Sequence, residues 1–349
     1  MKLSVMLNYS GDVVAAADEI VALEQAGLDA VWVAEAYSFD AISMMGYLAA
    51  RTSRVEIGSA IVNVYSRTAT LLAMSAAGLD AVSGGRIILG LGASGPQVIE
   101  GFHGVPYEKP MARIKETMEV CRKVWKREVI DYHGATIDIP LPAGEGTGLG
   151  KPLKLINHPV RNSIPLYWAS LKGKSVEATA EVADGWIPVF YVPELADRVW
   201  GDALALGMKK RDASLGKLNV VAGGPVVIGD DVPVEKILDM GRPQAALYVG
   251  GMGARGKNFY NDIMSAYGWE AEAKTIQDLY LEGRKEEAAA AIPADYLAKA
   301  SLVGPEGFVK DRLAAYAEAG VTYLQCGLFG STEQKVRTVE TLRTLVDGL

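Results

Sequence analysis

Cysteine and histidine are both scarce in this chain of 349 residues. Its two cysteines, Cys121 and Cys326, lie in an expected helix and an expected strand. This excludes a disulfide framework and favours reduced thiols in the cytoplasm. The three histidines, His103, His133 and His158, are far apart in the chain, and no paired carboxylates stand at ligand spacing from them. We therefore expect no metal site.

Long apolar runs and excess positive charge are also missing. No apolar stretch is long enough to span a membrane, and the apolar run in residues 1–8 is too short for a signal peptide. With 35 basic and 42 acidic residues the net charge is −7. This argues against nucleic acid or an anionic membrane as a partner, so a polyanionic ligand would need a local basic patch. Half of the residues are apolar, which is ample for the core of a single large α/β domain.

What the chain does contain is a weak internal repeat. Four times an apolar helix end runs through a small or glycine-bearing turn into an apolar strand, in residues 23–35, 79–92, 181–190 and 316–327. Strands that alternate with helices predict a parallel sheet. We expect eight strands, near residues 3–7, 30–34, 55–62, 86–91, 164–169, 186–190, 218–227 and 322–327.

The clearest unit of this repeat is residues 55–95. A strand over 55–62 is followed by a helix that Thr68 can cap and that Gly84 and Gly85 can end, and then by a strand over 86–91. Both strands end in small or polar residues, where parallel α/β sheets bind ligands. Near the end of the chain, Ser331 and Gln334 predict a capping box for a last helix.

Two segments do not fit the repeat. Residues 129–163 are rich in glycine and proline and predict a hairpin with a loop. Residues 241–303 open with a glycine-rich stretch and continue as charged helices. Because both segments precede strands, we expect insertions that act as lids over one end of a barrel.

The loop Gly90-Leu-Gly-Ala-Ser-Gly95 matches the glycine pattern of dinucleotide sites. The match is weak, because no strand with an acidic end follows promptly. Three interpretations stay open: a nicotinamide dinucleotide site, a loop of small residues that lets a flat cofactor approach the backbone, and a simple turn.

Charged side chains supply further candidates. Glu35, Tyr37 and Asp40 follow the second strand, where a carboxylate can bond a ring or move a proton. We favour a functional role only for Glu35, because capping or solvation explains the other two equally well. Basic residues in glycine-bearing loops are candidates for phosphate or carboxylate binding, namely Lys172, Lys174, Arg255 and Lys257. Taken singly, each of these four side chains is also explained as an ordinary solvated surface residue.

Residues 59–104 resemble the luciferase-like flavin and deazaflavin oxidoreductases, most closely the actinobacterial branch that depends on coenzyme F420. The signature is Asn-x-Tyr-Ser-Arg at 63–67 followed by Leu-Asp-x-x-Ser-Gly-Gly-Arg at 79–86. The resemblance extends through residues 32–42, 165–186, 246–260 and 319–330, and so covers nearly the whole chain.

The resemblance implies a single (β/α)8 TIM barrel over residues 1–349, with the cofactor at the carboxyl ends of its strands. It implies a bulge on the third strand with a non-prolyl cis peptide at Ala60-Ile61, and Val62 and Asn63 beside the deazaflavin ring. It places the family's acidic residue after the second strand at Glu35, as a tentative catalytic group. It also makes Glu35 and the adjacent Ala36 contacts of the cofactor. The remaining implied cofactor contacts are Gly92, Ala93, Ser94, Gly95, Ala169, Ser170 and Leu171.

This sequence departs from the family pattern in places. Many relatives have histidine where this chain has Ala36, and several have a glutamate where it has Met6 or Pro96-Gln97. The cofactor class therefore transfers better than any proton donor. The implied reaction is hydride transfer between carbon C5 of the deazaflavin and a small organic substrate, such as a carbonyl, imine or activated alkene. Phe190, Tyr191 and Met252 are candidate walls of the substrate site, although such residues are as often part of a core.

Alternatives stay open at this point. One is an FMN-dependent monooxygenase, another a non-catalytic protein that binds F420 or flavin, and a third a nicotinamide dehydrogenase. The resemblance makes a homodimer possible, with the apolar helix in residues 68–82 as a candidate face. A monomeric core explains the composition of that helix equally well.

Overall fold

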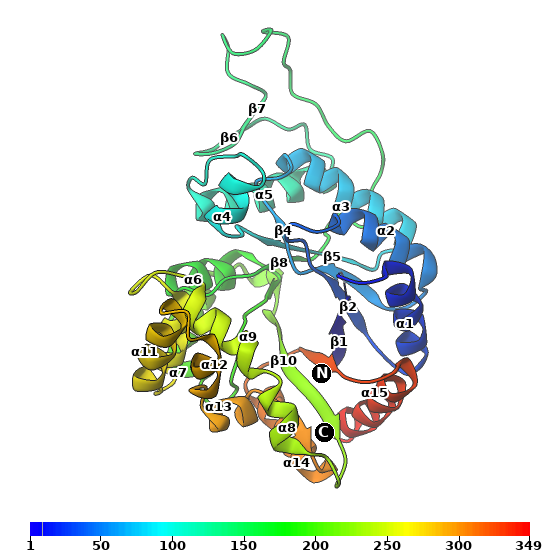
Figure 1. Ribbon diagram of the computed structural model, residues 1–349. Coiled ribbons are helices and arrows are strands. Elements are labelled where there is room, and N and C mark those ends of the chain that lie inside the picture. Colours follow the sequence, from blue (N-terminus) through cyan, green and yellow to red (C-terminus); the bar gives the residue numbers. More distant parts are fainter. Residues whose placement is uncertain (9) are drawn as a thin grey trace.

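The computed structural model describes residues 1–8 and 10–349 and shows a closed barrel of parallel strands inside a ring of helices (Figure 1). Neighbouring strands pair in parallel from β1 round to β9, and β10 closes the ring by pairing with both β9 and β12. The barrel strands are β1 (Lys2–Met6), β2 (Ala30–Val33), β3 (Glu56–Ser59), β5 (Ile87–Gly92), β8 (Leu166–Trp168), β9 (Gly185–Trp186), β10 (Asn219–Ile228) and β12 (Tyr323–Leu328). The predicted TIM barrel is confirmed.

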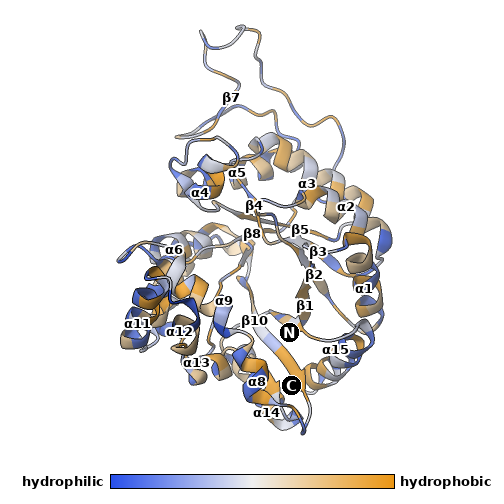
Figure 2. Ribbon diagram, viewed as in Figure 1, coloured by the Kyte–Doolittle hydropathy of each residue, from blue (hydrophilic) through white to orange (hydrophobic). Residues whose placement is uncertain are grey.

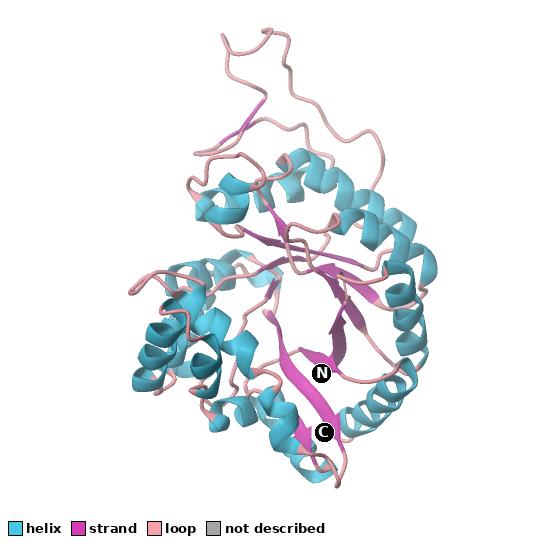
Figure 3. Cartoon of the chain, in the orientation of Figure 1, coloured by secondary structure: helices cyan, strands magenta, loops and turns pink. Residues whose placement is uncertain are grey.

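Helices surround the barrel on its outer side (Figure 3). They are α1 (Val13–Gln25), α2 (Ala41–Arg51), α3 (Ala69–Ser83), α5 (Pro110–Trp125), α6 (Gly173–Val182), α7 (Ala196–Lys210), α14 (Glu306–Glu318) and α15 (Thr332–Asp347), with the short α4 (Pro96–Gly101) and η1 (Ala213–Leu215) between them. The predicted end signals are confirmed: Thr68 caps α3, left-handed Gly84 ends it, and Ser331 begins α15 with a capping box. None of the helices in the described residues is both long and apolar enough to pass through a bilayer.

The strand residues divide between two apolar layers. Outward-facing residues such as Leu3, Val31 and Ile57 pack against the helices, which are banded with hydrophobic and hydrophilic residues in Figure 2. Inward-facing residues form a separate cluster that includes Trp32 and Tyr167. Because successive side chains of a strand point to opposite faces, each strand supplies both layers.

The third strand is interrupted, where the sequence predicts one continuous strand over 55–62. β3 ends at Ser59, the peptide bond Ala60-Ile61 is cis as expected, and a short strand β4 (Val62–Asn63) continues the pairing with β5. Gly58 lies opposite Ile88 and Val62 opposite Leu91. Four residue steps on one strand thus match three on its neighbour, which is a β-bulge.

The first insertion does not cover the barrel mouth as expected. After α5 the chain forms a small hairpin of β6 (Tyr132–His133) and β7 (Asp138–Ile139), and residues 140–152 extend away from the barrel (Figure 1). The chain then returns, since Leu153 bridges to Ile130 and Arg161 pairs with the buried Asp80. The carboxylate of Glu116 on α5 accepts backbone N–H bonds from Ala135 and Thr136, which holds the hairpin to the outer side of the helix. The segment is therefore an arm on the outside of the helix ring, not a lid.

The second insertion is helical. It consists of α8 (Val234–Asp239), α9 (Arg242–Ala246), the π-helix η2 (Leu247–Gly251), α10 (Phe259–Ala266), α11 (Glu270–Leu281), α12 (Lys285–Ala290) and α13 (Ala294–Lys299). The segment ends in a further strand that the sequence did not predict, β11 (Leu302–Gly304), which pairs with the last residues of β10. Only the first residues of β10 pair with β9. The insertion therefore joins the sheet at the carboxyl-terminal half of β10, on the edge facing away from β12.

Candidate active site

The carboxyl-terminal end of the barrel gathers the site residues expected from the sequence. They follow β2, β3 with β4, β5 and β8, and these strands are neighbours in that order. Four loops that are far apart in the sequence thus meet on one side of the barrel mouth. This is the end at which α/β barrels bind their ligands.

Aromatic rings form a floor below this mouth. The rings of Trp32, Tyr167 and Tyr323 lie inside the barrel with centroids 5.6 to 6.1 Å apart. At the amino-terminal end, Glu56 accepts hydrogen bonds from the Tyr323 hydroxyl at 2.8 Å and from the Lys2 ammonium at 2.7 Å. Burial, with the nearby Tyr167 and Glu56, raises the pKa of Tyr323 far above its ordinary value, so the phenol stays neutral. The barrel is closed from below.

Small residues line the bulge above this floor. Ala60 and Ile61 pack against the interior cluster, and a Cβ atom on Gly92 would lie 2.9 Å from the Ile61 side chain. A Cβ atom on Gly90 would lie 1.9 Å from the carbonyl oxygen of Ser59. The glycines of β5 are therefore explained by close contact with the third strand.

The match of Gly90–Gly95 to a dinucleotide fingerprint therefore does not indicate a dinucleotide site, because packing explains the glycines of β5. β5 is followed by α4, which has only six residues, and then by α5 instead of a strand. Within the loop, Ala93 is half-buried, Ser94 has a left-handed backbone (φ 56°) and Gly95 precedes α4. The Tyr107 hydroxyl donates to the Ser94 carbonyl at 3.2 Å and so fixes this loop at the mouth.

The side chains of Val62 and Asn63 do not face the mouth freely. Val62 is fully buried in the layer between strands and helices. Asn63 is buried, and its Oδ1 accepts the backbone N–H groups of Tyr65 at 3.0 Å and Ser66 at 2.8 Å. This Asx turn fixes the loop after the bulge.

Glu35 is held in a bidentate ion pair with Arg67. The two guanidinium nitrogens donate to its two carboxylate oxygens at 2.7 and 2.8 Å, and the Ala41 N–H at the start of α2 donates at 2.9 Å. The Glu35 side chain is only 6% exposed. Arg67 also donates to Asp40 at 3.1 Å. The hydrogen bonds with Glu35 help to raise the pKa of the Arg67 guanidinium. The adjacent Ala36 is half-buried.

The loop after β8 is held by two buried indoles. Ala169 packs against the interior cluster, the Ser170 carbonyl accepts from Trp186 Nε1, and the Leu171 carbonyl accepts from Trp200 Nε1, both at 2.9 Å. The helix α6 follows at once and has no side-chain cap. Its first backbone N–H groups thus remain available for an anion.

The predicted basic residues separate into two places. Lys172 precedes α6, with its Nζ 3.8 Å from the centroid of the Phe259 ring, and Lys174 lies in the first turn of α6. Arg255 and Lys257 lie on the insertion, where Arg255 pairs with Asp278 at 2.9 Å. The contact between Lys172 and Phe259 brings the segment that follows Lys257 close to the loop after β8.

The histidines and cysteines lie on separate elements. His133 pairs with two aspartates on the hairpin, His158 contacts Arg127, and His103 follows α4. No group of three or more potential metal ligands occurs in residues 1–8 and 10–349. Cys121 and Cys326 are buried, and burial raises the pKa of each thiol to about 12.

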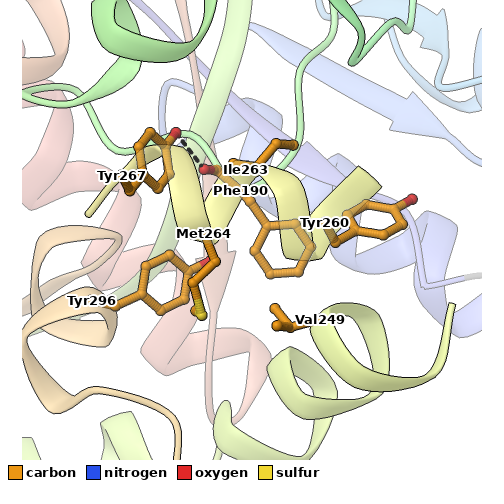
Figure 4. Close-up of a pocket in the computed structure, with 7 residues that line it drawn as sticks. All are labelled: Phe190, Val249, Tyr260, Ile263, Met264, Tyr267 and Tyr296. Carbon is orange, nitrogen blue, oxygen red and sulfur yellow. Dashed lines mark hydrogen bonds between the residues drawn. The ribbon is translucent and has the colours of Figure 1, made fainter. Parts of the chain in front are cut away.

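The second insertion is anchored on the loop after β9 by aromatic contacts (Figure 4). The Phe190 ring contacts the rings of Tyr260 and Tyr296, and its carbonyl accepts from the Tyr267 hydroxyl at 2.8 Å. Seven side chains line this cluster, Phe190, Val249, Tyr260, Ile263, Met264, Tyr267 and Tyr296, and the space between them does not admit a water molecule. Phe190 has a left-handed backbone (φ 55°), which such tight packing can enforce.

The three candidate substrate walls therefore differ. Phe190 is occupied by contacts with the insertion, and Met252 is half-exposed at the end of η2. The expectation for Tyr191 is wrong, because its ring stacks on Trp200 in the helix-side core and its hydroxyl donates to the Ala319 carbonyl. Hydrophobic character alone does not tell which of the two apolar layers a residue joins.

Sequence reasoning missed Arg67, which is the main partner of Glu35. The signature Asn-x-Tyr-Ser-Arg contains it, but nothing in the spacing connects it to a carboxylate 32 residues earlier. It also missed the indoles of Trp186 and Trp200 as supports of the loop after β8. Each of these contacts joins loops that only the closed barrel brings together.

A family model described as luciferase-like monooxygenase matches residues 1–323. A protein of Mycobacterium tuberculosis, named as a coenzyme F420-dependent oxidoreductase, is 39% identical over 96% of each chain. A 5,10-methylenetetrahydromethanopterin reductase of Archaeoglobus fulgidus is 25% identical over 87% of this chain and 86% of its own.

Among solved structures, the coenzyme F420-dependent tetrahydromethanopterin reductase from Methanopyrus kandleri has the same fold. It superposes with a TM-score of 0.80 over 99% of this chain and 98% of its own, at 20% identity. At this identity the likeness is one of fold.

Proposed function

This chain belongs to the family of luciferase-like monooxygenases, and we propose that within the family it is a coenzyme F420-dependent oxidoreductase. The observation that carries the proposal is the 39% identity, over 96% of both chains, with a relative of that name. The bulge in the third strand, which the family resemblance implies, is consistent with this family and would serve an F420 or an FMN site equally.

The residues at the mouth fit a flat cofactor with an anionic side chain. When bound, F420 supplies a hydride donor or acceptor at ring carbon C5. The bulge offers Ala60 and Ile61 as an apolar support for one ring face, and Gly92 allows Ile61 to pack closely against β5. The uncapped start of α6, with Lys172 and Lys174, suits a phosphate group.

We assign Glu35 a positioning role in this site. Both carboxylate oxygens accept charge-assisted hydrogen bonds, so neither is free to exchange a proton with a substrate. The pair joins the loop after β2 to the loop that follows the bulge. We infer that this ion pair fixes the bulge, and that another group or water transfers the proton.

The substrate would be a small organic molecule with an electrophilic carbon, as in a carbonyl, imine or activated alkene. The chain's own residues would exclude water and orient this carbon toward the cofactor. The second insertion lies beside this mouth, because Phe259 contacts Lys172 and Tyr267 bonds to the loop after β9.

An FMN-dependent monooxygenase is the second candidate, because the family description itself names that activity. A non-catalytic protein that binds F420 or flavin is a third reading, supported by Ala36 in place of histidine. A nicotinamide dehydrogenase has lost its main support, since the glycines of β5 are explained by packing.

Turnover assays distinguish the remaining candidates. The protein would be mixed with reduced F420 and a panel of ketones, imines and activated alkenes without oxygen, and reoxidation of the cofactor followed by fluorescence. We expect reoxidation that depends on both protein and substrate. Turnover only with reduced FMN and oxygen would support the monooxygenase, and tight F420 binding without turnover of any substrate would support the non-catalytic reading.

We further propose a homodimer through the outer face of α3. The exposed large side chains of this helix are Leu71, Met74 and Val82, and its one charged residue, Asp80, is buried in an ion pair with Arg161. An outer helix face without charge favours contact with another apolar surface. Val82→Glu should shift the protein to monomers in sedimentation experiments, and an unchanged sedimentation coefficient would rule this face out.

We also propose that the protein is cytoplasmic. Two buried free thiols support a reducing compartment. Fractionation of cells that express the full chain tests this location.

A further inference from the structure

Exposed aromatic side chains gather at one end of the barrel. The half-exposed or more exposed phenylalanines and tyrosines of the described residues are Tyr37, Phe39, Phe102, Phe259, Phe308 and Phe329. Tyr37, Phe39 and Phe329 lie in loops after barrel strands, Phe102 directly follows α4, Phe259 lies on the insertion, and Phe308 lies in the first turn of α14 after β11. Single exposed aromatic residues are ordinary, but such one-sided clustering marks a contact surface.

Three of these residues form what we call the aromatic rim: Tyr37, Phe39 and Phe102. Their exposed fractions are 70%, 63% and 65%, the highest among the exposed aromatic residues. Tyr37 and Phe102 come from the loops after β2 and β5, and their ring centroids are 6.3 Å apart. These loops flank the third strand, so the rim lies on the same side of the mouth as the bulge.

The charges next to the rim are satisfied within the chain. Arg67 is shared by Glu35 and Asp40, and Asp40 also accepts the N–H groups of Ile42 and Ser43. Hydrogen bonds from Ser43, together with the Arg67 charge, lower the pKa of Asp40 although burial opposes this. An apolar group that covered these exposed rings would remove them from water.

We propose that the substrate carries an apolar portion that extends out of the barrel mouth onto the aromatic rim. This inference rests on the proposed oxidoreductase function and names the substrate class of that site. The electrophilic carbon would lie inside the mouth, and the rim would bind the alkyl or aryl part beyond it. Removing apolar surface from water is the source of the affinity.

A homologous series of straight-chain methyl ketones tests the proposal. Their dissociation constants would be measured by calorimetry on the F420-loaded protein. Once the chain is long enough to reach the rim, each added methylene should tighten binding by about threefold to fourfold. The variant Tyr37→Ser/Phe102→Ser should lose this gain for long ketones and keep the affinity for short ones.

Leu206→Ser is the control, because Leu206 is also an exposed apolar side chain but lies near the end of the outer helix α7, away from the mouth. It should bind every ketone like the wild type, and the affinity for F420 should be unchanged in all variants. Affinity that does not rise with chain length, or an equal loss in both variants, would overturn the proposal. A rim variant that changes only the oligomeric state would assign the rim to a second copy of the chain. Failure of the wild type to bind F420 would instead remove the proposed function.

Discussion

The two ends of the barrel are built from different kinds of residues. At the amino-terminal end, Lys2, Glu56 and Tyr323 form a hydrogen-bonded set beneath aromatic rings that fill the interior. At the carboxyl-terminal end, alanine and glycine line the bulge, and the large aromatic side chains stand outside in solvent. One end is closed by large side chains of the chain itself, and the other presents small residues at the bulge.

This difference separates stability from binding. Substitutions at the closed end should change the free energy of unfolding and leave ligand affinity intact. Substitutions among the small residues of the open end should do the reverse. The pair of Glu35 and Arg67 is the exception, because it is buried at the open end and should affect both properties.

The largest effect is expected for Arg67→Ala. It leaves the Glu35 carboxylate buried without its partner, so stability should fall by about 3–5 kcal/mol in denaturant unfolding. The control is Arg51→Ala, which removes an exposed pair with Asp18 and should cost about 0–1 kcal/mol. Equal losses in the two variants would show that the pair at the mouth is not structurally special.

Gly92→Ala should act on binding. The added Cβ would come within 2.9 Å of the Ile61 side chain and displace it into the mouth. We expect F420 affinity to fall about tenfold, which is about 1.4 kcal/mol, with a smaller change in stability. Gly101→Ala is the matched control, because no atom lies within 4 Å of its added Cβ. Unchanged F420 binding in Gly92→Ala would place the cofactor elsewhere.

Glu24→Gln tests the closed end. This buried carboxylate accepts the N–H groups of Arg54 and Val55 just before β3, at 2.6 and 2.8 Å. Burial opposes ionisation, but these hydrogen bonds and the Arg54 charge outweigh it and lower the pKa of Glu24 below its ordinary 4.5. The substitution should cost about 1–3 kcal/mol at neutral pH and leave F420 affinity unchanged.

The same residue predicts a pH dependence with a definite sign. Because the folded-state pKa is lowered, the stabilisation is present above the unfolded-state pKa and is lost as pH falls through the folded-state value. The stability difference between wild type and Glu24→Gln should therefore shrink in acid. A difference that stays constant down to strongly acidic pH would contradict this account.

The smallest effect is expected for thiol reagents. Cys121 and Cys326 are buried at the helix-facing side of the sheet, and burial raises the pKa of each to about 12. The folded protein should resist alkylation at neutral pH, as read by mass spectrometry, while the unfolded protein reacts at both residues. Rapid modification of the folded chain would show that one of them is accessible.

The sequence predicted those parts of the fold that depend on local patterns. The barrel strands follow apolar runs, and Thr68 and Ser331 cap helices as their positions indicate. The cis bond at Ala60-Ile61 was implied only by family resemblance. Local patterns failed at Tyr191, because β9 has only two residues and its alternation cannot be extended to the following loop.

The site was less predictable than the fold for a physical reason. Its geometry depends on contacts between loops, such as Arg67 with Glu35 or Trp200 with the carbonyl of Leu171. The spacing of these residues in the sequence does not indicate that they are in contact. The direction of the arm in residues 140–152 was likewise unpredictable. Its composition indicates a loop, but not the side of the barrel on which it lies.

The most direct test is a titration of the purified protein with coenzyme F420 and, separately, with FMN, followed by fluorescence. The proposed function predicts micromolar binding of F420 and much weaker binding of FMN. Tight binding of FMN without binding of F420 would contradict the proposed cofactor, and the enzyme would then be studied as an oxygen-dependent monooxygenase.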